Sequence, residues 1–409
     1  MNLLLQSSIK SLKSTIKVTG SKSESNRLLL LKALYPNLKI ENLSNSDDSE
    51  FMEKGLNVSK GIVDIHHAGT AMRFLTAFFA TQEGREVTLT GSKRMKERPI
   101  SILVDALKQL GANISYELNE GYPPLVIKGK KLTENKVTLA ANVSSQYISA
   151  LLLVAPKLKK GIELTLEGKI TSVPYINMTL AILNEIGVET SFIENVITVK
   201  PKEVVEDKTL VVESDWSSAS YFYSIVALCD VGTEITLSAY KENSLQGDSS
   251  LVTFYKSFGV ESFFESNKLT LVKKAEVNLD SKIEFDLSNS PDIAQTIAVT
   301  CFGLGIGCHL TGLHTLKIKE TDRLEALNEE LGKLGAKIKV TNKELFLEPS
   351  ASINKNITIG TYNDHRMAMA FAPLALKVPI IIEDANVVSK SYPDFWDDMK
   401  KLQFSTEIK

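Results

Sequence analysis

Basic and hydroxyl side chains recur in this sequence where an expected strand ends and an expected helix begins. The run Gly20-Ser-Lys-Ser-Glu-Ser-Asn-Arg27 follows an expected strand at 14–18 and precedes an apolar run at 28–34 that indicates a helix. Backbone N–H groups at a helix start, together with hydroxyl, ammonium and guanidinium groups, suit a phosphate. Neither glycine of a Walker loop stands at the required spacing from Lys22. Taken alone, an ordinary serine-rich helix cap explains the run better.

Similar junctions follow along the chain, and each is weak evidence by itself because helix caps and solvated charged faces have the same composition. They are Ala68-Gly-Thr-Ala-Met-Arg73, Arg94-Met-Lys-Glu-Arg-Pro-Ile100, Ser144-Ser-Gln-Tyr147, Ser290-Pro-Asp292, Lys317-Ile-Lys-Glu-Thr-Asp-Arg323, Thr361-Tyr-Asn-Asp-His-Arg366 and Lys390-Ser-Tyr-Pro-Asp394. Together the junctions place these basic residues at the ends of expected elements: Lys22, Arg27, Arg73, Arg98, Lys319, Arg323, Arg366 and Lys390. The whole chain carries a formal net charge of -2, so the cations are a local concentration. We therefore expect a ligand, or a pair of ligands, rich in phosphate and carboxylate.

The overall composition excludes several classes of protein. The 409 residues are 43% hydrophobic and 23% charged, which is typical of a folded globular chain with two or three domains. The near-neutral net charge gives no indication of nucleic-acid or membrane-surface binding. No stretch reaches the roughly 18–20 apolar residues of a membrane span, and the apolar start at 3–5 is too short for a signal peptide. We expect a cytoplasmic protein.

The cysteines indicate a reducing compartment and no metal site. Cys229, Cys301 and Cys308 are an odd number of thiols in apolar segments, so they cannot form a fully paired disulfide framework. Cys301, Cys308 and His309 lie in a run that indicates a buried helix and turn, and no second ligand pair has zinc spacing. We therefore expect free thiols and no bound metal.

The elements that must position the junctions show an internal repeat. Four expected helices end in a large apolar residue, a glycine and a small apolar residue, and these glycines at 111, 187, 259 and 335 are 76, 72 and 76 residues apart. Glycine suits the left-handed position that closes a helix, and the alternating runs after each glycine indicate a hairpin. Degenerate copies around Gly55 and at 395–403 bring the number of units to about six. We expect an α+β fold of two domains with three units each, divided near 213–215.

The motifs together resemble those of the EPSP synthases, members of the enolpyruvyl transferase family. Gln246-Gly-Asp248 and Asn363-Asp-His-Arg-Met-Ala-Met369 also match, and all the motifs occur in the family's order from residue 20 to residue 394. The resemblance implies a two-domain fold in which each domain has three βαβαββ units, a six-fold internal repeat. It also implies that residues 20–213 form one domain, that residues 1–19 and 214–409 form the other, and that the active site lies in the cleft between them.

The resemblance further implies a reaction. This family transfers the enolpyruvyl group of phosphoenolpyruvate to the 5-hydroxyl of shikimate 3-phosphate, giving 5-enolpyruvylshikimate 3-phosphate and phosphate, in the biosynthesis of chorismate and the aromatic amino acids. Both substrates are polyanions, so the site must supply several cations, and no metal or cofactor is needed when ammonium and guanidinium groups neutralise the phosphates. We expect a monomer with these small-molecule substrates, no nucleic-acid or membrane partner, and sensitivity to the inhibitor glyphosate.

Site residues carry over from the matching motifs. The resemblance assigns shikimate 3-phosphate binding to Lys22, Ser23, Arg27, Ser144, Ser145, Gln146, Ser172, Tyr175, Asp292, Thr315 and Lys319. It assigns phosphoenolpyruvate binding to Lys22, Gly69, Arg98, Gln146, Arg323, Arg366 and Lys390. We expect Asp292 to be the base for the 5-hydroxyl, Glu320 to transfer the proton at the methylene carbon, and Lys22 to be a second acid. The division of these roles stays open at this point.

The sequence departs from the family pattern at several positions. His67 stands where asparagine is common, Phe74 where proline is common, and Val173 where a basic residue is frequent. Thr315 stands where asparagine is common. Only 18 residues separate Asp48 from His67, compared with a few dozen in many members. We therefore expect the first of the six units to be shortened and to lack a hairpin.

Two alternative functions remain open. The sister transferase that acts on UDP-N-acetylglucosamine shares the fold but typically has a cysteine in the loop that here reads Gly91-Ser-Lys-Arg-Met-Lys-Glu-Arg98, and this loop has none. A non-catalytic relative that binds phosphorylated metabolites is favoured slightly by the shortened first unit. Against it stands the joint presence of Lys22, Asp292, Glu320, Arg323 and Arg366.

Overall fold

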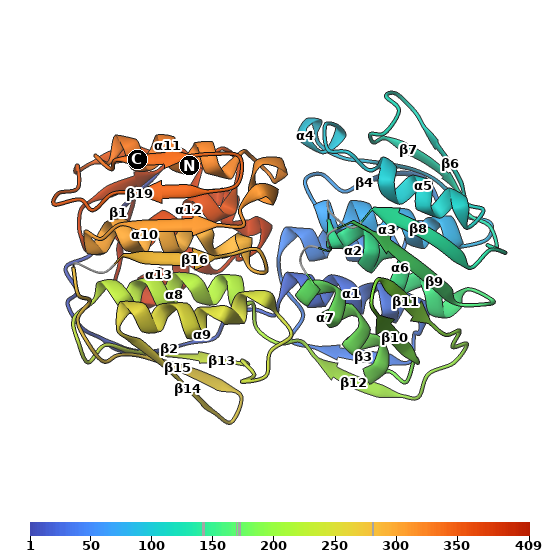
Figure 1. The fold of residues 1–409 in the computed structure, drawn as a ribbon, viewed down its shortest axis with the longest axis horizontal. Coiled ribbons are helices and arrows are strands. Elements are labelled where there is room, and N and C mark those ends of the chain that lie inside the picture. Colours follow the sequence, from blue (N-terminus) through green and yellow to red (C-terminus); the bar gives the residue numbers. More distant parts are fainter. Residues whose placement is uncertain (141–143, 169, 171–172, 280–281) are drawn as a thin grey trace. The chain divides into compact units, whose positions relative to one another are not determined.

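The chain folds into two compact parts, here called the terminal lobe and the central lobe. The structure is a computed structural model that describes residues 1–140, 144–168, 170, 173–279 and 282–409. The terminal lobe combines Met1–Thr19 with Glu213–Lys409, and the central lobe is Gly20–Val212. The chain therefore passes between the lobes twice. Figure 1 shows the blue N-terminal strand β1 (Leu3–Gln6) beside the orange and red elements of the terminal lobe.

Over its described residues, the central lobe contains two four-stranded sheets and one two-stranded sheet. One sheet has the order β4-β5-β7-β6, formed by β4 (Lys60–Asp64), β5 (Glu86–Thr90), β7 (Leu125–Lys128) and β6 (Asn113–Tyr116). Another has the order β10-β11-β9-β8, formed by β10 (Thr190–Ile193), β11 (Val196–Val199), β9 (Ile162–Glu167) and β8 (Lys136–Ala140). The two-stranded sheet pairs β3 (Leu38–Glu41) with β12 (Lys208–Val211) in parallel.

The described part of the terminal lobe contains three four-stranded sheets. The first is β14-β15-β13-β2, formed by β14 (Val260–Glu265), β15 (Lys268–Lys273), β13 (Glu234–Ser238) and β2 (Lys13–Ile16). The second is β16-β17-β19-β18, formed by β16 (Ile283–Asp286), β17 (Cys308–Thr311), β19 (Leu345–Leu347) and β18 (Ile338–Val340). The third is β20-β21-β1-β22, which adds β20 (Ile357–Ile359), β21 (Ile380–Ile382) and β22 (Ser405–Ile408) to β1.

Each four-stranded sheet combines one parallel pair with two antiparallel pairs. In the central lobe, β4 and β5 run parallel, whereas β5 and β6 both pair with β7 in antiparallel fashion. The terminal lobe repeats this arrangement, for example with β16 and β17 parallel and β17 and β18 antiparallel to β19. The sheet of β3 and β12 has the parallel pair alone. A parallel pair needs a crossover connection, and α3, α6, α10 and α12 lie in the crossovers of four such pairs.

The helices alternate with these strands. Those of the central lobe are α1 (Lys22–Leu34), α2 (Asp47–Leu56), α3 (Gly69–Thr81), α4 (Lys93–Lys96), α5 (Ser101–Gln109), α6 (Ser145–Val154) and α7 (Val173–Glu185). Those of the terminal lobe are α8 (Trp216–Leu228), α9 (Leu251–Phe254), α10 (Ala294–Leu304), α11 (Arg323–Lys333), α12 (His365–Phe371) and α13 (Phe395–Lys401). Helices α3, α6, α8 and α12 are buried along almost their whole length. Other elements therefore cover every face of these helices.

Each lobe has its own hydrophobic core. Residues of α1, α3, α6 and α7 belong to the core of the central lobe, whereas residues of α8, α10, α11 and α12 belong to that of the terminal lobe. Close packing in a core leaves a helix little freedom to shift. Side chains in the first turns of these helices therefore start from fixed backbone positions.

The glycine pattern of the sequence is confirmed at the ends of the repeated helices. Gly111, Gly187, Gly259 and Gly335 have φ angles of 97°, 82°, 72° and 98°, which is the left-handed region that closes a helix. Gly55 differs, because it lies inside α2 instead of closing it. A Cβ atom at Gly55 would lie only 2.4 Å from the side chain of Leu75 on α3, so this glycine permits close packing of the two helices.

The described residues also bear on the cysteines and on membrane spans. Cys229, Cys301 and Cys308 are buried free thiols, as expected, and burial raises the pKa of Cys229 to about 11. Cys308 starts strand β17, so the expected helix and turn end before it. In the described ranges, no group of three or more histidine, cysteine or acidic side chains is arranged to hold a metal ion. None of the described helices is both long and apolar enough to cross a membrane.

Candidate active site

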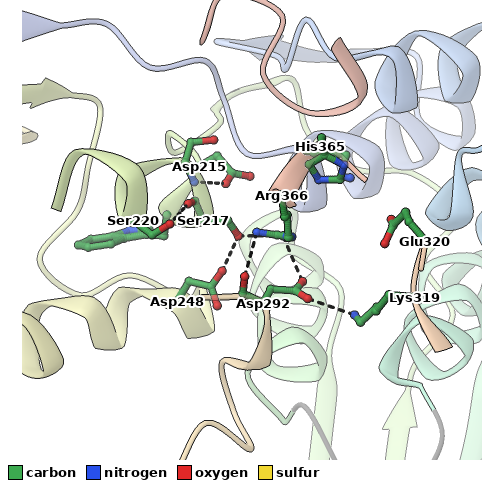
Figure 2. A network of polar contacts seen from close by, with 12 residues as sticks. Asp215, Ser217, Ser220, Asp248, Asp292, Lys319, Glu320, His365 and Arg366 are labelled. Carbon is green, nitrogen blue, oxygen red and sulfur yellow. Dashed lines mark hydrogen bonds and ion pairs between the residues drawn. The ribbon is translucent and has the colours of Figure 1, made fainter. Parts of the chain in front are cut away.

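Asp292 joins three cations in the terminal lobe. It lies in the 3₁₀ turn Pro291–Ile293 that leads into α10, and its carboxylate accepts hydrogen bonds from Arg323 Nη1 at 2.8 Å and Arg366 Nη2 at 3.1 Å. Lys319 Nζ lies 3.4 Å from Asp292 Oδ1. Figure 2 shows the carboxylate between Arg366 and Lys319. Burial by itself raises the pKa of Asp292, but the three cations together hold it well below its usual range.

Arg323 is buried and bonded to further carboxylates. It is the first residue of α11, and its Nε donates to Asp364 Oδ2 at 2.7 Å while its Nη2 donates to Glu320 Oε2 at 2.8 Å. Burial lowers the pKa of Arg323, but Asp364, Glu320 and Asp292 raise it above its ordinary value. The guanidinium is therefore a fixed positive charge, and a substrate anion must compete with carboxylates for it.

Arg366 lies in the first turn of α12 and is positioned through both its backbone and its side chain. Asp364 caps the helix, because its Oδ1 accepts a hydrogen bond from the Arg366 backbone N–H at 2.9 Å. The same carboxylate binds Arg323, so one side chain positions both arginines. Arg366 Nη2 also donates to Ser217 Oγ at 3.2 Å. Burial lowers the pKa of Arg366, and Asp292 in particular raises it well above its ordinary value.

A second carboxylate, Asp248, extends this network toward α8. Ser217 lies in the first turn of α8, and its hydroxyl donates a hydrogen bond to Asp248 Oδ2. Figure 2 shows Asp248 and Asp292 on either side of the contact between Ser217 and Arg366. Burial raises the pKa of Asp248 to about 6, and the negative charge of Asp292 adds to this effect. Asp248 is therefore an acid that changes its charge near neutral pH.

Lys390 contacts the turn that precedes α12. Its Nζ donates to the backbone oxygen of Asn363 at 2.6 Å and to its side-chain oxygen at 2.7 Å. Tyr362 and Asn363 both have left-handed backbones, with φ angles of 53° and 57°. Asparagine adopts this region readily, whereas tyrosine does so at a cost, and the Tyr362 hydroxyl is held by Glu330 Oε1 at 2.6 Å. The turn that meets Lys390 is thus anchored on α11.

Lys22 begins the set of predicted residues in the central lobe. It is the first residue of α1, and its Nζ lies 3.3 Å from Oδ2 of Asp48 in the first turn of α2. Ser23 follows it, and the Ser23 carbonyl oxygen accepts a hydrogen bond from Arg27 Nη1 at 2.6 Å. The ammonium group of Lys22 is thus positioned by a carboxylate to which the sequence analysis assigned no role.

Arg27 is buried among neutral groups. Its Nε donates to Thr179 Oγ1 at 2.8 Å, and its Nη2 donates to Ser149 Oγ at 3.0 Å and to the Tyr175 backbone oxygen at 3.2 Å. Burial lowers the pKa of Arg27 to about 10. The guanidinium also lies over the ring of Phe74, 5.5 Å from its centre. Phe74 therefore packs against a predicted substrate-binding residue.

Gly69 and Arg98 are in direct contact. A Cβ atom at Gly69 would lie 2.6 Å from Arg98 Nη1, so only glycine allows the guanidinium to take this position. Arg73 ties the two segments together, because it donates from Nη1 to the Gly69 backbone oxygen at 3.2 Å and from Nη2 to the Pro99 backbone oxygen at 3.2 Å. Arg73, one of the basic residues at the junctions, therefore fixes the backbone next to Arg98 relative to Gly69.

The start of α6 carries the next predicted residues. Ser144 caps this helix, and its hydroxyl accepts from the Gln146 backbone N–H at 3.3 Å. Ser145 is the buried first residue of the helix. Gln146 Nε2 donates to Thr70 Oγ1 at 3.1 Å, which links α6 to α3. The predicted residue Ser172 lies outside the described residues.

The structure brings the predicted residues together within each lobe. In the terminal lobe one network contains Asp292, Lys319, Glu320, Arg323 and Arg366. Lys390 contacts Asn363, which immediately precedes Asp364 of the same turn. Thr315 lies in the 3₁₀ turn His314–Ile318, and its hydroxyl has no hydrogen-bond partner among the described residues.

Three carboxylates of these networks were given no role by sequence reasoning, although two of them lie in the matching motifs. They are Asp48, which binds Lys22, and Asp248 and Asp364, which belong to the Arg366 network. Asp48 lies in the first turn of α2, and Asp364 caps α12. An acidic residue at a helix start is usually interpreted as a cap, so its second role as the partner of a distant cation is hidden in the sequence.

Comparison with known proteins points to one family. A family model described as EPSP synthase (3-phosphoshikimate 1-carboxyvinyltransferase) matches residues 53–399. The 3-phosphoshikimate 1-carboxyvinyltransferase of Bacteroides fragilis is 43% identical over 401 residues, which cover 97% of each chain. That of Colwellia psychrerythraea is 36% identical over 418 residues, which cover 95% of this chain and 96% of the relative.

A solved structure agrees with these matches at the level of the fold. The structure of EPSP synthase from Acinetobacter baumannii is similar to this chain with a TM-score of 0.78 and 18% sequence identity, and each chain is covered completely. The family model and the relatives span nearly the whole sequence, including the network around Asp292. The chain therefore belongs to the EPSP synthase family.

Proposed function

We propose that this protein transfers the enolpyruvyl group of phosphoenolpyruvate to the 5-hydroxyl of shikimate 3-phosphate, giving 5-enolpyruvylshikimate 3-phosphate and phosphate in the shikimate pathway. The observation that carries the proposal is the network in which Asp292 meets Arg323, Arg366 and Lys319 in a member of this family. It provides fixed cations for anionic substrates and a carboxylate for proton transfer at one place.

Asp292 is the proposed base. It takes the proton of the 5-hydroxyl while the hydroxyl oxygen attacks C2 of phosphoenolpyruvate. The surrounding cations keep the pKa of Asp292 low, so the carboxylate is ionised at neutral pH but is a weak base. When substrate anions bind Arg323 and Arg366, they neutralise part of the positive charge around Asp292. The pKa of Asp292 then rises toward its ordinary value. Substrate binding thus makes the base stronger where it is needed.

Glu320 is the proposed acid at the methylene carbon, and Lys22 is the second candidate. A proton added to C3 of phosphoenolpyruvate makes a methyl group while C2 accepts the hydroxyl oxygen, which gives a tetrahedral intermediate. Removal of a methyl proton and loss of phosphate from C2 then restore the double bond in the product. Arg323 binds Glu320 at 2.8 Å, so it orients the carboxyl group and favours its return to the ionised form.

The remaining site residues are proposed to bind the two substrates. Arg323, Arg366 and Lys390 in the terminal lobe, with Lys22, Gly69, Arg98 and Gln146 in the central lobe, are proposed for phosphoenolpyruvate. Lys22, Ser23, Arg27, Ser144, Ser145, Gln146, Ser172, Tyr175, Asp292, Thr315 and Lys319 are proposed for shikimate 3-phosphate. Guanidinium groups bind carboxylate and phosphate through two oxygens, which fits both anions. On this proposal, both lobes act on the same pair of substrates.

The experiment is an assay of phosphate release from phosphoenolpyruvate by the purified protein, with a separate acceptor in each reaction. Release that requires shikimate 3-phosphate and yields the enolpyruvyl product by mass spectrometry supports the proposal. Release only with UDP-N-acetylglucosamine would reassign the protein to the sister transferase. Binding of both substrates without any release would make it a non-catalytic relative.

We further propose that the protein works as a monomer in the cytoplasm. Its three cysteines are buried free thiols, which suits a reducing compartment. Light scattering after size-exclusion chromatography should give the mass of a single 45.1 kDa chain. A mass near twice that value would contradict the monomer.

A further inference from the structure

His67 stands beside the ion pair that holds Lys22. It lies two residues before Gly69, in the segment that leads into α3. Its Nε2 atom is 3.6 Å from Asp48 Oδ1 and 3.9 Å from Asp47 Oδ2. The other oxygen of Asp48 is 3.3 Å from Lys22 Nζ. Asp48 therefore lies between an ammonium group and an imidazole, and the charge of an imidazole depends on pH.

The environment makes this arrangement electrostatically effective. The side chain of Asp48 is only 7% exposed, and those of Lys22 and His67 are 16% and 22% exposed. Charges that are removed from water in this way interact more strongly than surface charges. The ring of Phe51 packs edge-on against the His67 ring, 5.8 Å between centres, and restricts its movement.

The charged and titratable groups around His67 come from several elements. They are Asp47 and Asp48 on α2, Lys22 on α1, His66 on the same segment, and Arg98, whose guanidinium contacts Gly69. The two aspartates attract an imidazolium at this place, whereas Lys22 and Arg98 repel it. Asp48 is the group among these that lies 3.6 Å from His67 and also pairs with Lys22, so it connects the two side chains.

The charge on His67 affects how strongly the carboxylate of Asp48 interacts with Lys22. When the imidazole is neutral, the carboxylate of Asp48 pairs mainly with Lys22. When the imidazole is protonated, it takes part of that interaction, and Lys22 is freer to bind a substrate anion. The imidazolium also adds a positive charge near the proposed phosphoenolpyruvate residues. Asparagine at this position would have no charge to change.

We propose that His67 is a positioning residue that acts on Lys22 through Asp48, so that phosphoenolpyruvate binds more tightly as the pH falls and His67 becomes protonated. Because Lys22 belongs to the proposed substrate site, this role rests on the proposed function. Histidine is the side chain that commonly changes its charge between about pH 5 and 8, so the test covers this range.

The test compares the wild type with His67→Asn from about pH 5.5 to 8.5. KM and kcat for phosphoenolpyruvate are measured at saturating shikimate 3-phosphate. Both substrates carry phosphates that titrate in the same range, so the informative quantity is the ratio of the two KM values at each pH. We expect the KM of His67→Asn relative to wild type to rise about three- to tenfold from high to low pH, with a nearly constant ratio of kcat values. A KM ratio that does not change with pH overturns the proposal.

His66→Asn is the matched control. His66 neighbours His67 in sequence, is exposed, and has a left-handed backbone with a φ of 48° that asparagine tolerates. Its ring stacks on Phe51, and the ion pair given for Asp48 with a histidine is that of His67. His66→Asn should follow the wild-type pH dependence. If it removed the dependence as His67→Asn does, the effect would not belong to His67.

A second measurement does not depend on catalysis. The His67 ring signals are assigned by their loss in His67→Asn and followed by NMR against pH in the wild type and in Asp48→Asn. Coupling predicts that the titration midpoint of His67 falls by about half a unit or more when Asp48 loses its charge. An unchanged midpoint in a folded Asp48→Asn protein overturns the coupling. If the wild type showed no enolpyruvyl transfer, the proposed function would fall, whereas this titration would still decide whether His67 and Asp48 interact.

Discussion

Arg323 and Arg366 are proposed to bind substrate anions, but both guanidinium groups already pair with carboxylates. Asp292 is a partner of both arginines. Substrate binding at these residues is therefore an exchange of partners. An exchange yields less net binding energy than contact with unpaired cations, because the existing ion pairs must be weakened. The benefit is that each guanidinium is held in a defined orientation before the substrate arrives, which is how preorganised charges stabilise a transition state.

Removal of a substrate-binding arginine should impair turnover without unfolding the protein. Arg366→Ala and Arg98→Ala each remove a charge-assisted contact worth about 1.5–3 kcal/mol, so kcat/KM for phosphoenolpyruvate should fall about tenfold to more than a hundredfold. Arg94→Ala is the control, because Arg94 is exposed and pairs only weakly with Glu97 at 3.5 Å. Steady-state kinetics and circular dichroism check both points, and near-normal kcat/KM in either test variant would exclude that residue.

Asp248 should make the stability of the protein depend on pH. Its native pKa of about 6 lies above the ordinary value of 3.8, so the folded state keeps a proton that the unfolded state loses. The contribution of Asp248 to the free energy of unfolding is therefore greatest below about pH 4 and falls as the pH rises to about 6. Two pKa units correspond to at most about 3 kcal/mol. Asp248→Asn should remove this part of the decline.

The measurement is urea unfolding of wild type and Asp248→Asn at several values between about pH 4 and pH 7. As the pH rises, the free energy of unfolding should fall less for Asp248→Asn than for the wild type. Asp105→Asn, which changes an exposed aspartate, should show no such change. Parallel curves for wild type and Asp248→Asn would mean that burial does not shift the titration of this residue.

At the scale of the element, the first turns of five helices, α1, α3, α6, α11 and α12, carry a large share of the residues proposed for the site. These residues are Lys22, Ser23, Gly69, Ser145, Gln146, Arg323 and Arg366. These helices differ in length and composition, but each starts after a strand or turn and is held by one of the two cores. Backbone N–H groups at a helix start are unpaired by the helix itself, so they suit anions. A change that shifts a first turn therefore affects binding without contacting the substrate.

Gly69→Ala tests such a shift in α3. The added methyl group would meet Arg98 Nη1 at 2.6 Å, so the guanidinium must move. A methyl group that instead met bound glyphosate directly would weaken inhibition alone. We expect a higher KM for phosphoenolpyruvate and weaker inhibition by glyphosate together. Gly332→Ala on α11 is the control, because a methyl group there meets nothing within 4 Å and should leave both constants unchanged. A rise in the inhibition constant alone would favour the direct clash.

The sequence could predict elements whose signals are local. Gly111, Gly187, Gly259 and Gly335 follow an amphipathic run, and a left-handed helix end strongly favours glycine, so their positions were predictable. Gly55 has similar neighbours in sequence, but its role depends on the distance to Leu75 on another helix. Local sequence carries no information about such a distance.

The same limit applies to the site. The cations were predictable because several motifs repeat them at helix starts. Their carboxylate partners were not, because Asp48 meets Lys22, and Asp364 meets Arg323, only after helices far apart in sequence pack together. The contact of Phe74 with Arg27 likewise depends on the packing of α3 against α1. Pairing across elements is a property of tertiary structure.

At the scale of the whole molecule, each lobe is packed around its own core. If both lobes act on one pair of substrates, bound ligands must hold two independently packed bodies in one arrangement. We expect the radius of gyration from small-angle X-ray scattering to decrease when shikimate 3-phosphate and glyphosate are added together. Shikimate without its phosphate should have a smaller effect at the same concentration. An unchanged radius at saturation would contradict the shared site.

The pairing of β1 has a consequence for biosynthesis on the ribosome. Strand β1 lies between β21 and β22, and its partners Ile380–Ile382 and Ser405–Ile408 are near the other end of the chain. The ribosome adds about 5–20 residues per second, so β1 is synthesised on the order of 20–80 s before these partner strands. The central lobe is contiguous and can fold during that interval. The apolar run Leu3-Leu-Leu5 is thus exposed throughout most of translation, and a chaperone has that long to bind it.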